Sequence, residues 1–208
     1  MSRPSENVIH PDPAGLRETP EFSPEVRRIL LEIAHSSIIS GIADKPLPDG
    51  PPSLPSLPDF RAPLLEPRGV FTTLYLRGQL RGCVGFAMPL HPLFRAVAET
   101  ARAAAFQDTR FWPVTPDELA DLKISLSVLS PLFPIEADRV EVGRHGLLIS
   151  HGLRRGLLLP QVPIEHGWDR LTFLEQTCHK AGLPGDAWRS ASLEAFTAEV
   201  FGDDGASS

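Results

Sequence analysis

Cysteine is scarce in this chain, because its 208 residues include only Cys83 and Cys178. A disulfide framework is therefore excluded, and the lack of a CxxC pair argues against a structural zinc site. No stretch approaches the roughly 18 apolar residues that a membrane span needs. Residues 1–10 also lack the basic end and apolar run of a secretory signal. We therefore expect a cytoplasmic protein that makes no contact with a membrane.

Basic residues are also too few to give a positive surplus. The chain has 20 Lys and Arg against 26 Asp and Glu, a formal net charge of -6. Proteins that bind phosphate backbones usually show a basic excess, so a nucleic-acid partner is not expected. No compact ligand signature such as HExxH occurs, and we predict neither a metal nor another cofactor. A hydrophobic content of 42% is typical of globular proteins.

The patterning that is present predicts an α+β protein with an antiparallel sheet and flanking helices. Residues 1–21 are predicted to be a flexible arm, residues 22–202 the folded domain, and residues 203–208 a flexible tail. Helices are expected from Ser23 to Gly41, at about 92–106 and after Asp169, with a short one after Thr115. Strands are expected at 70–76, 80–86, 122–128, 146–150, 156–162 and 196–200. The proline-dense segment 46–67 is expected to form an extended strap.

The most informative segment is Leu80–Phe86, with the sequence LRGCVGF. Strand alternation predicts that Arg81, Cys83 and Gly85 share one face and that the other residues face the core. A guanidinium near a thiol favours the thiolate, and glycines leave room for a ligand or for another backbone. The functional interpretation is a reactive or ligand-binding Cys83 beside an Arg81 that binds an anion. Gly82 and Gly85 would then line the same binding site.

A structural interpretation of this segment stays open. Free cysteine is among the most buried residue types, so Cys83 would lie under a helix that the glycines admit. Arg81 would then form an internal ion pair with a glutamate or aspartate. The second cysteine is assigned to the core, because a helical stripe contains Leu171, Leu174, Cys178 and Ala181.

Two further segments contain candidate site residues. Histidine is the usual base for a catalytic cysteine, and His145 lies in the glycine-flanked segment GRHG. No spacing signature pairs His145 with Cys83. The segment Leu159–Asp169 places Gln161 and Glu165 just before a helix start, where hydrogen-bonding groups are concentrated, so we include both as candidate binding residues.

These segments together resemble the AMMECR domain family, whose prokaryotic branch is called AmmeMemoRadiSam system protein A. Leu80–Gly85 is similar to the family signature LRGC(I/V)G, and Ala104–Phe111 is similar to AAFxDPRF. Further similarity to (I/V)SVLS, G(K/R)HGL and RGLxLPQV occurs at Ile124–Ser130, Gly143–Leu147 and Arg155–Val162. The resemblance covers about residues 22–202 in the expected order.

The chain departs from the family pattern at a few positions. Thr109 stands where the family usually has proline, and Ser125 and Phe133 stand where acidic residues are frequent. If other members of the family use those carboxylates in a site, this chain does not have them. Among the candidate histidines only His145 matches the pattern, which favours it as a catalytic group.

The resemblance implies two intimately packed subdomains, with the LRGC strand beside a cleft. It also implies association with a Memo-type protein and a radical SAM enzyme, but it supplies no reaction. Three hypotheses stay open: a component of this system that binds a small-molecule or protein ligand at the LRGCVG strand; a cysteine-dependent enzyme with Cys83 as nucleophile and His145 as base; or a purely structural scaffold. The exposure of Cys83 and its position relative to His145 discriminate among them.

Overall fold

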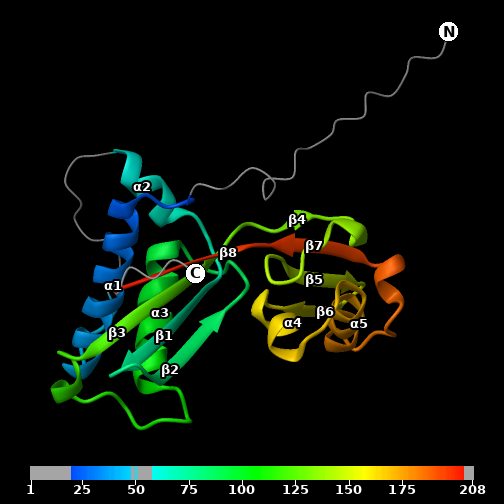
Figure 1. Ribbon diagram of the computed structural model, residues 1–208. Coiled ribbons are helices and arrows are strands. Elements are labelled where there is room, and N and C mark those ends of the chain that lie inside the picture. Colours follow the sequence, from blue (N-terminus) through cyan, green and yellow to red (C-terminus); the bar gives the residue numbers. More distant parts are fainter. Residues whose placement is uncertain (1–19, 48–49, 51–57, 204–208) are drawn as a thin grey trace.

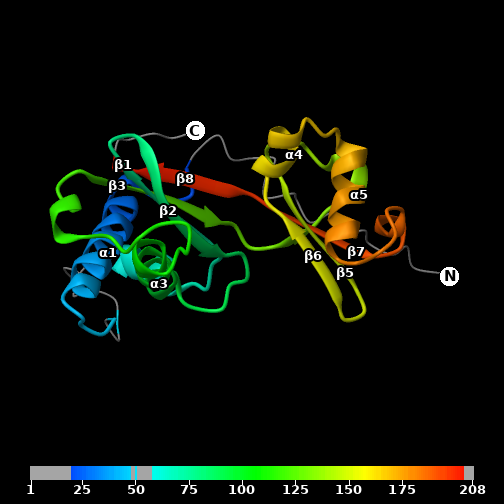
Figure 2. The ribbon, with the colours of Figure 1, turned by 90° about the horizontal axis from the view of Figure 1, so that it is seen from below.

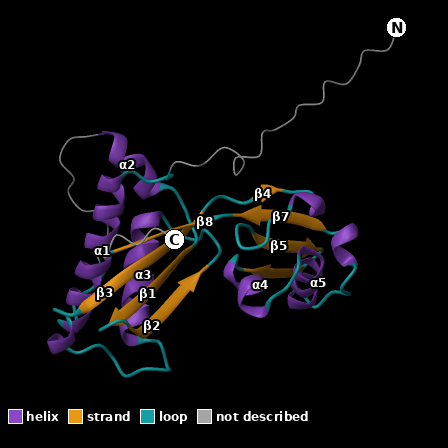
Figure 3. Ribbon diagram, viewed as in Figure 1, coloured by secondary structure: helices purple, strands orange, loops and turns teal. Residues whose placement is uncertain are grey.

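The computed structural model describes residues 20–47, 50 and 58–203 and contains two four-stranded sheets with flanking helices (Figure 1, Figure 3). The strand orders are β2-β1-β3-β8 and β4-β7-β5-β6, and the paired strands are antiparallel. The predicted α+β class is therefore confirmed. None of the helices in the described ranges is long and apolar enough to cross a membrane.

The first sheet and its helices form the larger half of the fold. Its strands are β1 (Val70–Leu76), β2 (Gln79–Phe86), β3 (Leu122–Leu129) and β8 (Ala198–Gly202). Its helices are α1 (Pro24–Ile42), α2 (Pro58–Leu65) and α3 (Leu93–Phe106). Helix α1 begins as predicted, because the Ser23 side chain accepts a hydrogen bond from the Val26 amide at 3.3 Å. Leu30, Val97 and Leu126 belong to the core between these helices and the sheet.

The second sheet forms a smaller half with its own core. Its strands are β4 (Phe133–Pro134), β5 (Gly146–His151), β6 (Arg154–Leu158) and β7 (Ser192–Phe196), and its helices are α4 (Gln161–His166) and α5 (Arg170–Lys180). Asp169 is the N-cap of α5, since its carboxylate accepts the Thr172 amide at 2.8 Å. Cys178 is fully buried as predicted, but Leu171 on the expected stripe is 49% exposed.

The chain crosses between the two sheets at Ser130 and Thr197. The Ser130 amide donates to the Thr197 carbonyl at 2.9 Å, and the Thr197 amide donates to Ser130 Oγ at 3.0 Å. Strand β7 continues into β8 after Thr197, so the segment predicted as one last strand serves both sheets in turn. This crossing joins the two halves, as the uninterrupted red segment in Figure 1 shows.

Among the residues that the structure describes, no helix lies on one face of the first sheet. In Figure 2, α1 and α3 lie below the first sheet, whereas α4 and α5 lie above the second. Strand register places nine residues on the uncovered side, which we call the open face: Phe71, Thr73, Tyr75, Leu80, Cys83, Gly85, Lys123, Ser125 and Ser127. These residues are half-buried or exposed, while their strand neighbours Thr72, Leu74 and Leu126 are buried. The open face and α4 thus lie on the same side of the molecule.

Several predicted boundaries were wrong. The strap 46–67 contains helix α2, which is anchored by the fully buried Leu64; residues 48–49 and 51–57 lie outside the described part of the chain. The strand predicted to reach residue 162 ends at Leu158, and α4 follows. Asp203, assigned to the tail, accepts the Ile124 amide at 2.7 Å and belongs to the fold. The remainder of the predicted arm and tail, 1–19 and 204–208, lies outside the described residues.

Candidate functional site

A β-bulge divides the LRGCVG strand. The β1–β2 register pairs Leu74 with Gly82 but pairs Tyr75 with Leu80, so Arg81 is the extra residue. The bulge reverses side-chain parity, which puts Leu80 on the open face with Cys83 and leaves it 43% exposed. The predicted core position of Leu80 was therefore wrong.

Cys83 is half-buried on the open face and is held at the outer edge of the sheet. Its thiol accepts a hydrogen bond from Thr73 Oγ1 at 3.4 Å. Its amide donates to Asp108 Oδ2 at 2.8 Å, and its carbonyl accepts from Arg110 Nη2 at 3.4 Å. Two side chains thus occupy the main-chain groups that an edge strand leaves free, and they protect this edge from another strand.

Asp108 and Arg110 form a tight pair. Arg110 donates to both carboxylate oxygens, at 2.9 and 2.7 Å. The Arg110 side chain, together with the Cys83 amide, holds the pKa of Asp108 far below its usual range. Asp108 raises the pKa of Arg110 in turn. Sequence reasoning did not assign either residue to the site, although both lie in the AAFQDTRF segment that carried the family resemblance.

Arg81 points away from the open face and forms the internal ion pair of the structural alternative. Its Nε and Nη2 donate to the two oxygens of Glu118, at 2.7 and 3.0 Å. Its Nη1 and Nη2 also donate to the carbonyls of Trp112 and Pro113, at 2.8 and 3.3 Å. Arg81 lowers the pKa of Glu118 to about 2, with help from Thr115. The Arg81 guanidinium is thus saturated by protein groups and is not presented to a ligand.

The two glycines of the motif serve packing. A Cβ on Gly82 would lie 2.2 Å from the Ala104 carbonyl oxygen, so glycine admits the backbone of α3 on the covered face. A Cβ on Gly85 would lie 2.4 Å from the Phe71 ring on the open face. Gly82 therefore cannot contact a ligand on the open face, and Phe71 fills the space that Gly85 leaves.

His145 directly precedes β5 of the second sheet, whereas Cys83 lies in β2 of the first. The His145 side chain is only 1% exposed, its Nδ1 accepts the Glu141 amide at 3.0 Å, and its ring packs edge-on against Phe133. These contacts lie entirely within the second half. Cys83 contacts residues of the first half, whereas these contacts of His145 are to residues of the second half.

Gln161 and Glu165 lie on α4, the helix on the same side as the open face (Figure 2). Both are exposed, and Ile164 between them is 60% exposed. The two polar residues do not lie at the start of α5, because they belong to α4, a separate helix that ends before the Asp169 cap. They remain candidate contacts for a ligand that spans both halves.

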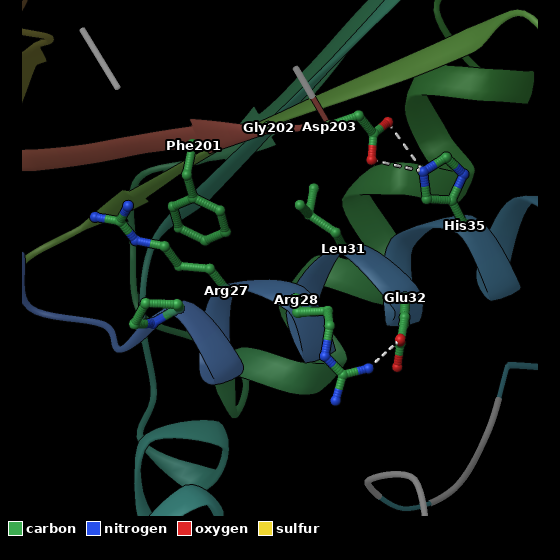
Figure 4. Close-up of a pocket in the computed structure, with 9 residues that line it drawn as sticks. Arg27, Arg28, Leu31, Glu32, His35, Phe201, Gly202 and Asp203 are labelled. Carbon is green, nitrogen blue, oxygen red and sulfur yellow. Dashed lines mark hydrogen bonds and ion pairs between the residues drawn. The ribbon is translucent and has the colours of Figure 1, made fainter. Parts of the chain in front are cut away.

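A cavity between α1 and the end of β8 has a different character (Figure 4). It measures about 360 Å³. His35 Nε2 lies 3.0 Å from both oxygens of Asp203, Arg28 pairs with Glu32, and the Arg27 guanidinium pairs with Glu199 at 2.9 Å. Arg27 and His35 of α1 thus bind Glu199 and Asp203, so these polar groups hold β8 and its end against α1. Across the residues that the structure describes, no group of three His, Cys, Asp or Glu is arranged to hold a metal ion.

Comparison with known proteins agrees with the fold and the motifs. Residues 31–201 match the AMMECR1 family model. Protein MK0488 of Methanopyrus kandleri is 48% identical over 150 residues, which cover 66% of this chain and 72% of that protein. A Methanothermobacter thermautotrophicus protein is 42% identical over 191 residues, 86% of this chain and 94% of the relative. The crystal structure of uncharacterized protein PH0010 from Pyrococcus horikoshii matches with a TM-score of 0.68 and 37% identity, over 88% of this chain and 94% of that one. The chain belongs to the AMMECR1 family.

Proposed function

We propose that this chain is a binding component of a Memo and radical-SAM associated system, and that it captures a substrate or partner on the open face beside Cys83. The observation that carries the proposal is the uncovered row Cys83, Thr73 and Ser125, which crosses three strands in register. A helix packed on this face would bury such a row. Here Cys83, Thr73 and Ser125, which carry the thiol and hydroxyl groups, are only half-buried. The association with a Memo-type protein and a radical SAM enzyme rests on the family resemblance.

The chemistry of the row supports binding better than catalysis. A cysteine nucleophile needs a base within hydrogen-bond reach, about 2.6–3.2 Å. Asp108 is the carboxylate beside Cys83, but Arg110 and the Cys83 amide hold its pKa far below neutrality, which makes it a weak base. The Thr73 hydroxyl donates a hydrogen bond to the Cys83 sulfur. In this arrangement Thr73 does not accept the thiol proton, so it does not act as a base. The row therefore offers a ligand hydrogen-bonding groups and a polarisable thiol.

The exposure of Cys83 predicts a difference in alkylation between the two cysteines. Brief iodoacetamide labelling should modify Cys83 at least about tenfold faster than Cys178, because Cys178 is fully buried and burial raises the pKa of its thiol. Peptide mass spectrometry of the folded protein measures the two rates, and labelling in denaturant is the control for intrinsic reactivity. Equal protection of both thiols in the folded state would contradict an accessible open face.

The binding proposal is tested with a substitution that adds bulk to the open face without touching the core. Ser125→Arg should weaken binding of the purified Memo-type or radical SAM protein of the same organism at least tenfold, because the new side chain projects across the Cys83 row. The matched control is Ser36→Arg, which adds the same side chain at an exposed position on α1, on the covered side. Titration by calorimetry with both variants measures the effect. Binding that is unaltered by Ser125→Arg would exclude this face as the docking site.

A further inference from the structure

The loop 107–115, which we call the edge loop, is fixed at several points along the outer edge of β2. Asp108 binds the Cys83 amide near one end, and the Val114 amide donates to the Ala105 carbonyl at 2.9 Å near the other. Val114 is only 4% exposed and is anchored in the first core. The apex is held as well, because Arg81 binds two successive carbonyls there. The backbone of this loop is therefore pre-organised.

The side chain at the apex of this rigid loop faces solvent. Trp112 is 88% exposed, although its own carbonyl accepts the 2.8 Å hydrogen bond from Arg81. When an exposed indole on a mobile loop binds a partner, the loop loses conformational entropy. A fixed backbone has already lost most of that entropy on folding, so binding costs less. Tryptophan and arginine are the residues most enriched among protein-binding hot spots. Trp112 thus has the side chain and the backbone support of an interface anchor.

The surroundings of Trp112 supply the remainder of an interface. Arg110, two residues earlier, has a side chain that is 57% exposed even while it pairs with Asp108. Tyr75 and Leu80, paired across β1 and β2 on the open face, are 38% and 43% exposed. Their strand ends lie next to Arg81, which ties them to the edge loop. Tyr75 and Leu80 therefore form a partly apolar area at the end of the open face, and Arg110 is an exposed cation on the neighbouring edge loop.

We infer that Trp112 anchors a protein-docking surface, and that its occupant is a folded protein with an apolar pocket for the indole and a carboxylate that meets Arg110. This inference rests on the proposed function, because it assigns the partner class for the sheet edge that contains Cys83. A projecting indole fits a partner's cavity, whereas small-molecule sites are concave. A lipid surface is disfavoured, because the exposed carboxylates of Asp117 and Asp121 lie next to the edge loop and Arg77.

The test measures affinity for the purified Memo-type protein and for the radical SAM protein of the same organism. Trp112→Ala should raise the Kd of the complex at least about 30-fold, and Trp112→Phe should raise it less. The matched control is Leu153→Ala, since Leu153 is a fully exposed apolar residue on the β5–β6 turn. It should leave the Kd unchanged. Thermal stability should be unaltered in all three variants, because both residues face solvent.

A direct readout uses the chain labelled with 5-fluorotryptophan. The ¹⁹F resonance of Trp112, assigned with Trp112→Phe, should shift on complex formation, while those of Trp168 and Trp188 should not. A complex that is weakened by Ser125→Arg but unaffected by Trp112→Ala would overturn this inference and leave the proposed function standing. Failure of both proteins to bind would overturn the two together. Binding of Trp112 to phosphatidylglycerol vesicles, without a protein complex, would replace the protein partner by a lipid surface.

Discussion

Gly82→Ala should lower the free energy of unfolding by about 3 kcal/mol. The added methyl group would lie 2.2 Å from the Ala104 carbonyl oxygen and 3.1 Å from its carbonyl carbon. Both atoms belong to the backbone of α3, which cannot rotate away as a flexible side chain does. Relief therefore requires α3 or β2 to move, and α3 is packed against α1 as well as against the sheet.

Urea denaturation at neutral pH measures this effect through the midpoint at constant slope. Gly50→Ala is the matched control, because a Cβ there would meet no atom within 4 Å. Its stability should stay within about 0.5 kcal/mol of the wild type. A loss below about 1 kcal/mol for Gly82→Ala would contradict the close approach of α3, and the glycine would then need another explanation.

Local patterns predicted much of the first sheet from the sequence. The strict alternation from Leu122 to Val128 gives β3, whose burial alternates accordingly over most of its length. The capping box at Thr115 is present, with the Thr115 amide donating to Glu118 at 2.8 Å. These features depend on neighbours in sequence, and a sequence pattern contains all the information that they need.

Features that depend on distant contacts were not predictable in this way. The bulge at Arg81 is selected by Glu118 and by the Trp112 carbonyl, more than 30 residues away. No local pattern shows that the guanidinium turns to the edge loop, so the face of Leu80 was misassigned. The placement of Cys83 and His145 in different halves of the fold has a similar cause. After the crossing at Ser130 the chain forms the strands of a second sheet. The choice of His145 among the histidines could not take this into account.

Replacement of Arg81 by alanine should destabilise the protein at neutral pH by roughly 2 kcal/mol. The substitution leaves the half-buried Glu118 carboxylate without its main partner and removes the hydrogen bonds to two carbonyls. The matched control is Arg77→Ala, which removes an ion pair to Asp121 at 3.4 Å between side chains that are 81% and 53% exposed. Exposed pairs contribute about 0–1 kcal/mol, so Arg77→Ala should have a much smaller effect. Equal losses in the two variants would show that Glu118 gains no special stabilisation from Arg81.

The pH dependence of these variants gives a second, independent test of the same ion pair. Arg81, with a smaller contribution from Thr115, lowers the pKa of Glu118 from 4.5 to about 2 in the folded protein. Because the folded-state pKa lies below the unfolded-state value, the pair stabilises the fold above about pH 4.5 and loses this contribution as the pH falls towards 2. The difference in unfolding free energy between wild type and Arg81→Ala should therefore shrink steadily over that range, as urea titrations at several pH values would measure. A difference that stays constant from pH 7 to pH 2.5 would mean that Arg81 acts through its carbonyl contacts at the edge loop, and that Glu118 contributes little.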